Sequence, residues 1–576
     1  YLQNTYDGSE DIVFNIINLT FLQKVKKEKY IFLKDLKILS FFEKRNHQRI
    51  SRYPVVARWR DDIFFTIASI SCFQPWVLNR VIDPPANPLV MSQTSLRFND
   101  IDNVGRTGRH LTLFEMMAHH AFNTPENQVY FKDETVKLCH EFLLSLGISP
   151  EEIVYLEADW SGGGNSGPCF EVIVRGVELA TLVFLMYEGE GKEKREMEMQ
   201  VVDTGYGLER LTWSSLGTPN VYEAIFGPVL EKLKQEVTLE INPEVIREYS
   251  KLSGMINSNK NVKEIKEKIA KELGLSKKDK KSLTFLENLY AICDHTRALM
   301  FMLNDGIIPS NVKGGYFARL LARRTLRFLN SLNLDFPLKE IVRWQIDYFK
   351  RSFPELEKNR EDIERILDVE EKKYKKTIEK GKKIVENLDS RLRSKGEIPT
   401  SELIKLYDTY GLTPEIVKEF SNLSVKIPNN FYIQVAEKHQ KLEREEKTEK
   451  EGEKISLNLP ETKRGFYEDA KIKEFKSKVL AKVKGGIILD KTYFYPEGGG
   501  QEGDQGKIED LEVVDTQKQG NIIIHQVRGN LNKIKVGQEV KCEINWERRK
   551  QLMQHHTSCH IINGAARRVL GNHVWQ

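Results

Sequence analysis

Cysteine is scarce in this sequence, and long hydrophobic runs are absent. The 576-residue chain has six cysteines, none of them in a Cys-x-x-Cys pair: Cys72, Cys139, Cys169, Cys293, Cys542 and Cys559. This pattern argues against a disulfide framework and predicts a reducing, cytoplasmic location. No apolar run comes near the ~18 residues that would cross a bilayer, so we expect neither a signal peptide nor a membrane span.

The sequence also has little net charge for its size. The formal net charge is +5, although 30% of the residues are charged and 40% are hydrophobic. A surface that binds nucleic acid would therefore have to be local rather than spread over the whole protein. The chain is too long for a single hydrophobic core, and its length indicates roughly three or four domains.

Hydrophobic periodicity separates sheet regions from helical regions. Three runs rich in β-branched and aromatic residues, 171–175, 179–186 and 197–202, predict strands. No segment long enough for a crossover helix separates the last two runs, which favours an antiparallel sheet over a Rossmann-type parallel one. From residue 286 the pattern predicts helices, including a long amphipathic helix over 360–390. Strand-like runs return from 466, and the last part is helical from about Trp546.

A basic stretch interrupted by glycines starts at Arg97. It contains Arg106, Arg109 and His110, and the apolar residues that follow predict a buried strand. Such a loop can hold an anion, because guanidinium groups bind phosphate bidentately and the strand fixes the loop. Taken alone, the stretch is equally well interpreted as a solvated basic loop.

A second informative stretch begins at Asp203. Gly205 and Gly207 would let the backbone approach a flat ligand, while Asp203, Glu209 and Arg210 bring charge to the same place. This combination suits a site that holds an ammonium group and a polyphosphate together. A strand–turn–helix corner with a surface ion pair is the competing interpretation.

In their order along the chain, these motifs resemble those of the alanyl-tRNA synthetase family, in its archaeal form. The catalytic matches are Arg97 with Arg109-His-Leu-Thr-Leu-Phe-Glu-Met116, Gly164-Asn-Ser-Gly-Pro-Cys-Phe-Glu171, and Val202-Asp-Thr-Gly-Tyr-Gly-Leu-Glu-Arg210. The matches to its tRNA-recognition helices are Asp294-His-Thr-Arg297, Asp305-Gly-Ile-Ile-Pro-Ser-Asn311 and Leu406-Tyr-Asp-Thr-Tyr-Gly411. The stretch from Tyr495 to Gly506 and His556-Thr-Ser-Cys-His560 resemble its editing region.

The resemblance implies a multidomain α+β fold. A class II synthetase antiparallel sheet flanked by helices would precede a helical tRNA-recognition domain, a small β-barrel and the start of an α/β editing domain. The expected parts are a leading segment (1–35), the catalytic domain (36–250), a charged insertion or hinge (251–285), the helical domain (286–436), a charged linker (437–465), the β-barrel (466–545) and the incomplete editing domain (546–576). We therefore expect a chain that is truncated or split within the editing domain.

The implied activity is alanine–tRNA ligation, in which ATP and Mg²⁺ activate L-alanine before its transfer to tRNA(Ala). The implied catalytic residues are Arg97, Arg109, His110, Asp203 and Arg210. ATP would contact Arg97, Arg109, Glu115, Gly207, Glu209 and Arg210, and alanine would contact Trp160, Asp203 and Gly205. Arg97 would stabilise charge that develops on the α-phosphate, and Asp203 would bind the ammonium group of alanine.

The resemblance also assigns tRNA contacts in the helical region. Asn311 and Asp408 would read a wobble pair in the acceptor stem, where the shallow minor groove of A-form RNA exposes base edges. Arg319, Arg323 and Arg324 lie at helical spacing on nearly one side and would suit backbone phosphates. A solvated basic helix face is the alternative.

In the editing region His556 and His560 lie one helical turn apart, as two zinc ligands require. Zinc needs three or four ligands, so we expect Zn²⁺ only in a completed site, for which a second polypeptide is a candidate. Gln501 and Asp504 would face the same pocket. Two other functions stay open: a free-standing zinc-dependent aminoacyl-tRNA deacylase, and a non-catalytic tRNA-binding relative.

Overall fold

The computed structural model describes residues 38–571 and 574, apart from 61, 190–193, 238–241, 257–261, 429–430, 432–434 and 436–458. The expected leading segment and most of the expected linker lie outside the described residues. The chain forms two compact units, residues 1–436 and 437–576. The first unit thus contains both the expected catalytic domain and the expected helical domain. Among the described residues, no helix has the length and apolar character needed to traverse a lipid bilayer.

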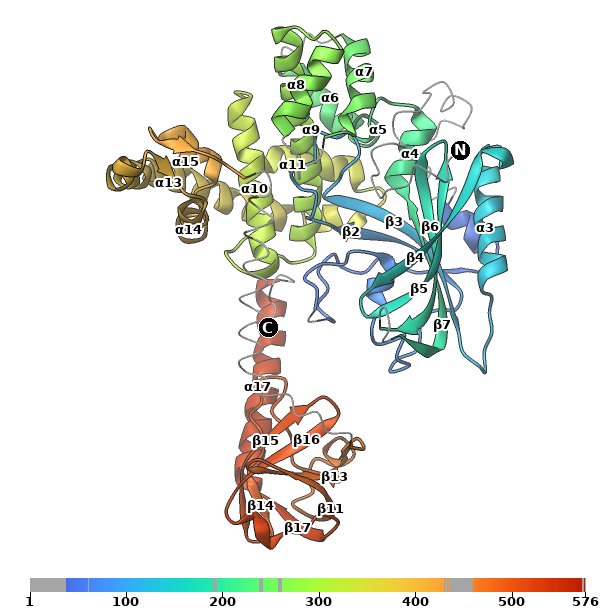
Figure 1. Cartoon of the computed structure of the whole chain (residues 1–576), viewed down its shortest axis with the longest axis vertical. Coiled ribbons are helices and arrows are strands. Elements are labelled where there is room, and N and C mark those ends of the chain that lie inside the picture. Colours follow the sequence, from blue (N-terminus) through green and yellow to red (C-terminus); the bar gives the residue numbers. More distant parts are fainter. Residues whose placement is uncertain are drawn as a thin grey trace. The chain divides into compact units, whose positions relative to one another are not determined.

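The first unit is built on a seven-stranded sheet with the order β1-β2-β3-β7-β6-β5-β4 (Figure 1). Its strands are β1 (Gln48–Arg49), β2 (Leu89–Leu96), β3 (Leu113–Asn123), β4 (Ile153–Gly162), β5 (Asn165–Val174), β6 (Val177–Glu188) and β7 (Arg195–Gly207). All neighbouring strands pair antiparallel except β1 and β2. The predicted antiparallel sheet is confirmed.

The glycine-rich stretch 160–169 forms the end of β4, the start of β5 and the turn between them. Trp160 is a residue of β4, paired with Gly167 of β5, and the loop between the two strands has two residues. Those residues, Gly163 and Gly164, both have positive φ, at 61° and 87°. Two successive residues with positive φ form a tight turn whose twist matches that of the paired strands of a hairpin. These two glycines are therefore required by the turn.

Helices precede, interrupt and follow the sheet strands in the sequence, and some of them pack onto one face of the sheet. They are α2 (Ser40–Glu43), α3 (Lys132–Ser145), α4 (Leu208–Leu216), α5 (Val221–Ile225), α6 (Gly227–Gln235), α7 (Pro243–Ser253), α8 (Val262–Glu272) and α9 (Lys277–Asn304). The charged insertion expected over 251–285 is therefore largely helical. Tyr249, Ile256, Ile269 and Leu283 give it a small apolar core. A capping box between Ser276 and Asp279 starts α9 ahead of the predicted position.

Further helices continue the first unit. They are α10 (Lys313–Ser331), α11 (Leu338–Phe349), α12 (Pro354–Lys358), α13 (Arg360–Leu392), α14 (Thr400–Tyr410) and α15 (Pro414–Phe420), with a two-strand pair of β8 (Glu397–Ile398) and β9 (Ser424–Val425). The long helix predicted over 360–390 is confirmed as α13. Short 3₁₀ turns lie at Ser69–Cys72, Pro150–Glu152 and Arg393–Lys395. Helix α9 contacts β3 as well as α6, α10 and α11, so it joins sheet and helices in one core.

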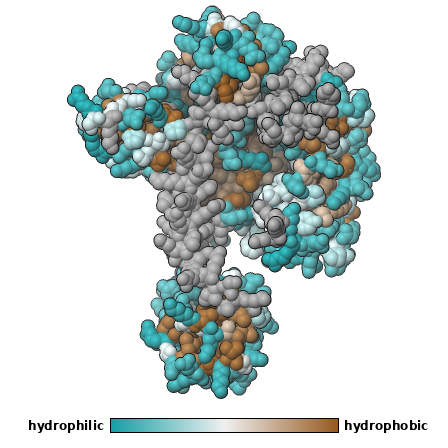
Figure 2. Space-filling view, in the orientation of Figure 1, coloured by the Kyte–Doolittle hydropathy of each residue, from teal (hydrophilic) through white to brown (hydrophobic). Residues whose placement is uncertain are grey.

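The second unit is a closed barrel in the order β11-β12-β16-β15-β14-β17, followed by a helix. Its elements are β10 (Lys463–Arg464), β11 (Glu474–Val483), β12 (Gly486–Leu489), β13 (Lys491–Thr492), β14 (Gly506–Ile508), β15 (Leu511–Gln519), β16 (Ile522–Arg528), β17 (Glu539–Ile544) and α17 (Trp546–Leu570), with 3₁₀ turns at Gly465–Tyr467 and Leu531–Lys533. The predicted small barrel and the helix start at Trp546 are confirmed. Hydrophobic residues gather in the middle of the barrel face shown in Figure 2, with hydrophilic residues around them.

Candidate active site

Asp203 lies in β7, directly opposite His120 of β3 and Val183 of β6. Side chains alternate along a strand, so Asp203 shares its sheet face with Val201, Val183 and Ala118, members of one apolar cluster. We call this side of the sheet the Asp203 face. Glu115 and Tyr206, by the same alternation, lie on the other side, which the helices cover.

The Asp203 carboxyl is almost wholly buried, with 8% of its side chain exposed. Burial raises the pKa of Asp203 to about 8, because the charged form loses hydration. His120 Nδ1 is 3.6 Å from Asp203 Oδ1, and burial lowers the pKa of His120 to about 3. The imidazole is therefore uncharged at neutral pH. His120 thus provides no positive charge to balance an ionised Asp203. A ligand cation would supply one.

Trp160 and Cys72 belong to the apolar cluster on the Asp203 face. Trp160 packs against the same apolar cluster that contains Cys72 and Val183. The pKa of the Cys72 thiol is raised by burial, lowered by Arg60 and raised by Asp203, so both of these side chains lie within electrostatic reach of the sulfur. Cys72 Sγ also donates a weak hydrogen bond to Gln93 Oε1 at 3.5 Å. The thiol and the amide thus lie beside the buried acid, and the indole lies on the same face of the sheet.

Gly205 and Gly207 follow Asp203 on the same face. A Cβ atom built on Gly205 would lie 3.1 Å from Met116 Sδ, and one on Gly207 would lie 3.4 Å from Arg210 Cδ. The absence of side chains at these positions makes room for Met116 and Arg210. Direct contact of either glycine with a ligand stays a prediction.

Two arginines beyond the strand ends lie within electrostatic reach of each other. Arg97 follows β2, and its guanidinium lies 4.9 Å from the ring centroid of Phe114. The Arg97 side chain is open to solvent, yet enough protein surrounds it that lost hydration lowers its pKa, and the positive charge of Arg210 lowers that pKa further. Arg210 Nη1 donates to Glu178 Oε2 at 2.6 Å. Burial favours the neutral form of Glu178, but Arg210, the Thr181 hydroxyl and Arg97 together outweigh this and leave the pKa of Glu178 below its usual value. Two cations within electrostatic reach of each other suit a polyanionic ligand.

The loop after Arg97 is packed against helices and is not a freely solvated segment. Gly105 has a φ of 83°, and a Cβ atom there would lie 2.4 Å from the carbonyl oxygen of Glu287 in α9. The backbone carbonyl of His110 accepts a 2.6 Å hydrogen bond from Tyr222, while its ring Nδ1 lies 2.7 Å from Thr107 Oγ1. Arg109 Nη2 donates to the Gly254 carbonyl at 3.1 Å. The helices therefore fix the path of this loop.

Glu115 and Glu209, two of the expected ATP contacts, require a correction. Both are buried beside Arg297 of α9, whose Nη2 lies 2.8 Å from Glu209 Oε1 and 3.7 Å from Glu115 Oε1. The Glu115 amide N–H donates to both Glu209 carboxylate oxygens, at 3.0 and 3.1 Å. Direct contact of these carboxylates with a nucleotide is wrong for this structure, because they lie on the helix-covered side. They instead hold β3 and α4 against α9.

The family of this chain follows from its sequence similarity to known protein families. The sequence model of the family described as "tRNA synthetases class II (A)" matches residues 36–548. The chain belongs to the class II tRNA synthetase family. The expected family resemblance is thereby confirmed.

Curated synthetase relatives point in the same direction. "Alanine--tRNA ligase" of Methanococcus maripaludis strain C6 is 44% identical over 567 residues, which cover 96% of this chain and 63% of the relative. "Alanine--tRNA ligase" of Pyrococcus abyssi is 47% identical over 574 residues, which cover 94% of this chain and 62% of the relative. "Alanine--tRNA ligase" of Methanothermobacter thermautotrophicus is 46% identical over 556 residues, which cover 94% of this chain and 61% of the relative. The chain thus spans less than two thirds of these relatives. A solved Giardia lamblia prolyl-tRNA synthetase in complex with prolyl-adenylate matches at 11% identity and a TM-score of 0.20, covering 47% of this chain and 66% of that chain, which is too weak to carry an argument.

The expected tRNA-contacting residues of this synthetase chain divide into exposed and buried ones. Asn311 is exposed just before α10, and its side-chain oxygen accepts a hydrogen bond from Arg319. Arg319 Nε also donates to Glu370 Oε1 of α13 at 3.0 Å. Asp408 is partly exposed near the end of α14. The structure therefore leaves the Asn311 and Asp408 positions accessible.

Arg323 and Arg324 require a second correction, because both are buried. Arg323 Nε donates to Glu370 Oε1 at 3.2 Å and its Nη1 to the Gly411 carbonyl at 2.6 Å. Arg324 Nη1 donates to Asp102 Oδ1 at 2.8 Å. These ion pairs hold α10 against its neighbours, so phosphate contact by these two side chains is wrong for this structure.

In the second unit the paired histidines are placed as the spacing predicts. His556 Nε2 and His560 Nε2 are 3.0 Å apart, and His556 Nδ1 lies 3.2 Å from Gln501 Oε1. Asp504, in contrast, is buried and forms an ion pair with Arg549 of α17. Its expected position facing the editing pocket is wrong, since the pair anchors α17 to the barrel. Within the described residues, no group of three or more His, Cys, Asp or Glu side chains could hold a metal.

Several residues of the candidate site were not predicted from the sequence. His120, Gln93 and Glu178 were not selected, although they contact Asp203, Cys72 and Arg210 respectively. Only one signal was available for His120, a pair of histidines at the end of an apolar strand. Nothing local marks Gln93 or Glu178.

Proposed function

We propose that this chain activates L-alanine with ATP and transfers it to the 3′ end of tRNA(Ala). A carboxylate oxygen of alanine attacks the α-phosphorus of ATP, and pyrophosphate leaves as alanyl-adenylate forms. A terminal ribose hydroxyl of the tRNA then attacks the carbonyl carbon, and AMP leaves. The observation that carries the proposal is a buried carboxyl, Asp203, on a sheet face that ends near two neighbouring arginines, Arg97 and Arg210.

The chemistry of each side chain fits one part of the substrates. Asp203 would accept hydrogen bonds from the alanine ammonium group, and the half-buried Trp160 would border the methyl group. Arg97 would neutralise charge developing on the α-phosphate, where a preorganised guanidinium is most effective. Arg210, oriented by Glu178, would bind the nucleotide beside it. Arg109 and His110 would support the outer phosphates from the loop that α9 and Tyr222 fix.

Mg²⁺ would accompany ATP as its phosphate-bound counter-ion. Magnesium ions in such sites keep several waters and are held by substrate phosphates with one or two carboxylates. The ion would supply further charge neutralisation at the phosphates, while Arg97 and Arg210 act on the same charge from the protein side.

For the tRNA we propose that Asn311 and Asp408 contact the acceptor stem. The amide and the carboxylate can address an exposed guanine amino group in the minor groove. Arg319 would position Asn311 through the hydrogen bond between them, and Glu370 would fix Arg319. Replacement of Asn311 by alanine should reduce tRNA charging while leaving alanine-dependent ATP–pyrophosphate exchange unchanged.

We further propose that His556 and His560 are two ligands of a zinc ion in an editing site, with Gln501 oriented toward them. The remaining ligands would come from outside the described residues, and a second polypeptide is one possible source. Zinc content of the purified protein, measured by mass spectrometry before and after His556→Ala, tests this. A cytoplasmic location stays a prediction.

Alanine-dependent ATP–pyrophosphate exchange tests the main proposal. We expect exchange with L-alanine to exceed exchange with other amino acids, and Arg97→Ala to abolish most of it. Arg343→Ala is the matched control, because Arg343 pairs with Glu364 at an exposed position between α11 and α13. A folded protein without exchange would contradict the proposal and favour either the deacylase or the non-catalytic tRNA-binding alternative.

A further inference from the structure

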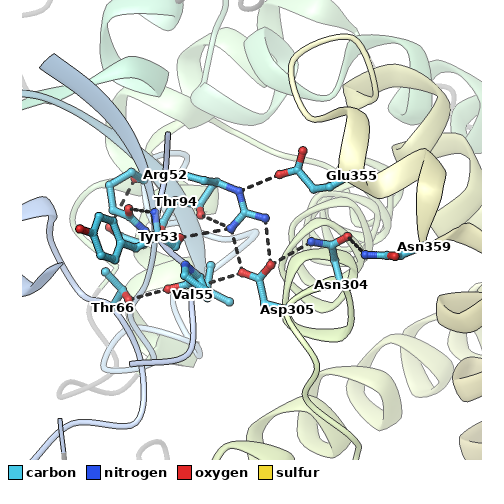
Figure 3. Close-up of polar contacts among 12 residues, drawn as sticks. Arg52, Tyr53, Val55, Thr66, Thr94, Asn304, Asp305, Glu355 and Asn359 are labelled. Carbon is cyan, nitrogen blue, oxygen red and sulfur yellow. Dashed lines mark hydrogen bonds and ion pairs between the residues drawn. The ribbon is translucent and has the colours of Figure 1, made fainter. Parts of the chain in front are cut away.

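Residues 50–60 form an irregular strap that follows β1, and one buried ion pair ties it to the end of α9. Arg52 reaches across to Asp305, with Nη1–Oδ2 and Nη2–Oδ1 distances of 2.8 and 2.9 Å (Figure 3). The backbone N–H of Val55 donates to the same carboxylate at 2.7 Å, and Arg58 Nη2 donates to the Asp305 carbonyl at 2.7 Å. One residue at a helix end thus holds the strap at three positions.

Two other groups complete the buried side of this contact. Arg52 Nε donates to Glu355 Oε1 of α12 at 3.0 Å, and Asn304 Nδ2 donates to Asp305 Oδ1 at 2.8 Å. Glu355 is 38% exposed, whereas the side chains of Arg52 and Asp305 are 11% and 6% exposed. Both carboxylates help to keep the pKa of Arg52 raised against the opposing effect of burial. Asp305 is therefore the buried, bidentate partner, and Glu355 is the outer one.

The other edge of the strap contacts the surroundings of Asp203. The Tyr53 N–H donates to Gln93 Oε1 at 2.8 Å, and Gln93 Nε2 donates back to the Tyr53 carbonyl at 3.0 Å. The same Gln93 oxygen accepts from Cys72, whose thiol lies within electrostatic reach of Asp203. The Tyr53 ring also packs edge-on against Phe73, which in turn packs edge-on against His120. A continuous set of contacts thus runs from Asp305 to Asp203.

Arg60 extends the strap to the far wall of the site. Its Nη1 donates to Gln74 Oε1 at 3.0 Å. Gln74 Nε2 then donates to the Gly162 carbonyl at 3.0 Å and to Asn165 Oδ1 at 2.7 Å, at the turn that follows Trp160. The strap therefore connects to both Gln93 and the Trp160 turn.

We propose that Arg52 and Asp305 are positioning residues for alanine binding. Their ion pair fixes the strap, and the strap fixes Gln93 and the Trp160 turn on either side of the amino-acid site. Neither residue touches substrate. This inference rests on the proposed function, since it assigns the Asp203 face to alanine. The strap reaches the surroundings of Asp203 by three routes, through Gln93, Phe73 and Gln74. It reaches Arg97 through Thr66, which donates to the Val55 carbonyl, and Ile67, whose carbonyl accepts from Arg97 Nε at 3.1 Å. Loss of the ion pair should therefore weaken alanine binding more than ATP binding.

Alanine and ATP KM values in pyrophosphate exchange test this positioning role. Asp305→Asn keeps an acceptor for the Val55 N–H but removes the charge that pairs with Arg52. We expect its alanine KM to rise by about tenfold or more, in line with the cost of small displacements in a site, while its ATP KM stays within about twofold. Arg52→Lys should act in the same direction, because an ammonium group cannot reproduce the two-point guanidinium contact.

Glu355→Gln is the matched control, since it removes the outer carboxylate from the same arginine and leaves the bond to Asp305. Its alanine KM should stay near the wild-type value. An unchanged alanine KM in folded Asp305→Asn or Arg52→Lys protein, or an equal rise in both KM values, would overturn the inference.

A second readout needs no turnover. Saturating alanine should raise the melting temperature of the wild type and of Glu355→Gln, and this rise should be lost in Asp305→Asn. If the wild type shows this alanine-dependent shift in melting temperature but no exchange, the proposed function fails, and the shift in Asp305→Asn still tests the positioning role. If Asp305→Asn keeps the full shift, the positioning role fails.

Discussion

The buried state of Asp203 makes alanine binding depend on pH in a specific way. With a pKa of about 8 in the free protein, the carboxyl is mostly neutral at pH 7. The proposed ligand carries an ammonium group and pairs with the ionised form. The apparent affinity for alanine is therefore reduced by the fraction of protein in which Asp203 is ionised.

The size of the effect follows from that pKa. The ionised fraction is about 1% at pH 6, about 9% at pH 7 and about one half at pH 8. The alanine KM, measured in pyrophosphate exchange at saturating ATP, should therefore fall about 50-fold from pH 6 to pH 8, and less than about twofold above pH 8. The ATP KM over the same range serves as the internal control for effects on the nucleotide.

Asp203→Asn separates this account from general effects of pH. The amide cannot ionise, so its alanine KM should be high and should no longer follow the titration between pH 6 and 8. Loss of the charged partner should cost about 2–5 kcal/mol of binding free energy. A wild-type alanine KM that is flat from pH 6 to 8, or an Asp203→Asn protein with the wild-type pH profile, would refute the reasoning.

Asp203 should also make the folding stability depend on pH, but in the opposite direction: alanine affinity rises with pH, whereas the free energy of unfolding falls. The folded state favours neutral Asp203, so this contribution to stability is complete below the ordinary pKa of 3.8 and is lost as the pH rises through about 8. His120 acts in the opposite direction between about 3 and 6.5. From pH 6.5 to 8 only the Asp203 term of this pair remains. It should lower the free energy of unfolding by at most about 1.4 kcal/mol per pH unit, measured by urea titration without ligand.

Three substitutions test other parts of the account. Arg97→Ala should lower kcat for exchange by about 100-fold or more with little change in the alanine KM, because the guanidinium acts on charge that develops at the phosphate. Steady-state kinetics measure this. A rise in the alanine KM as large as the fall in kcat would contradict it. Glu209→Gln should lower the free energy of unfolding by about 3–5 kcal/mol in urea titrations, since Arg297 is left in a buried site with a weakened partner; a change below about 1 kcal/mol would contradict the structural role. Asp504→Asn should reduce thermal stability by freeing the buried Arg549, while exchange activity stays unchanged; loss of exchange would show that the ion pair acts on the active site.

Sequence reasoning succeeded where the signal is local and periodic. The antiparallel strands, the long helix α13, the barrel and the start of α17 all follow from alternation or amphipathic spacing. Arg97 and Asp203 were selected because motifs of charge and glycine surround them. The structure places both on or beside one sheet face, which supports their assignment to a single site without testing it.

Sequence reasoning failed where a partner lies far along the chain. Glu115 and Met116 are neighbours on β3, and only the packing of α9 decides that the glutamate faces Arg297. Arg323 and Arg324 have the spacing of a basic surface, but their partners, Glu370 and Asp102, lie 47 and 222 residues away. Asp504 likewise pairs with Arg549, 45 residues further on. A charge seen in one dimension cannot be assigned to the surface or to a buried ion pair until the fold supplies its neighbour.

The central claim is that Asp203 and the Arg97–Arg210 pair form one site for an aminoacyl-adenylate. The most direct measurement is calorimetric binding of the stable alanyl-adenylate mimic in which a sulfamoyl group replaces the phosphate. The account predicts tight binding by the wild type, strong weakening by Asp203→Asn and no change in Arg343→Ala. Failure of the folded wild type to bind this mimic, or full affinity in Asp203→Asn, would contradict it.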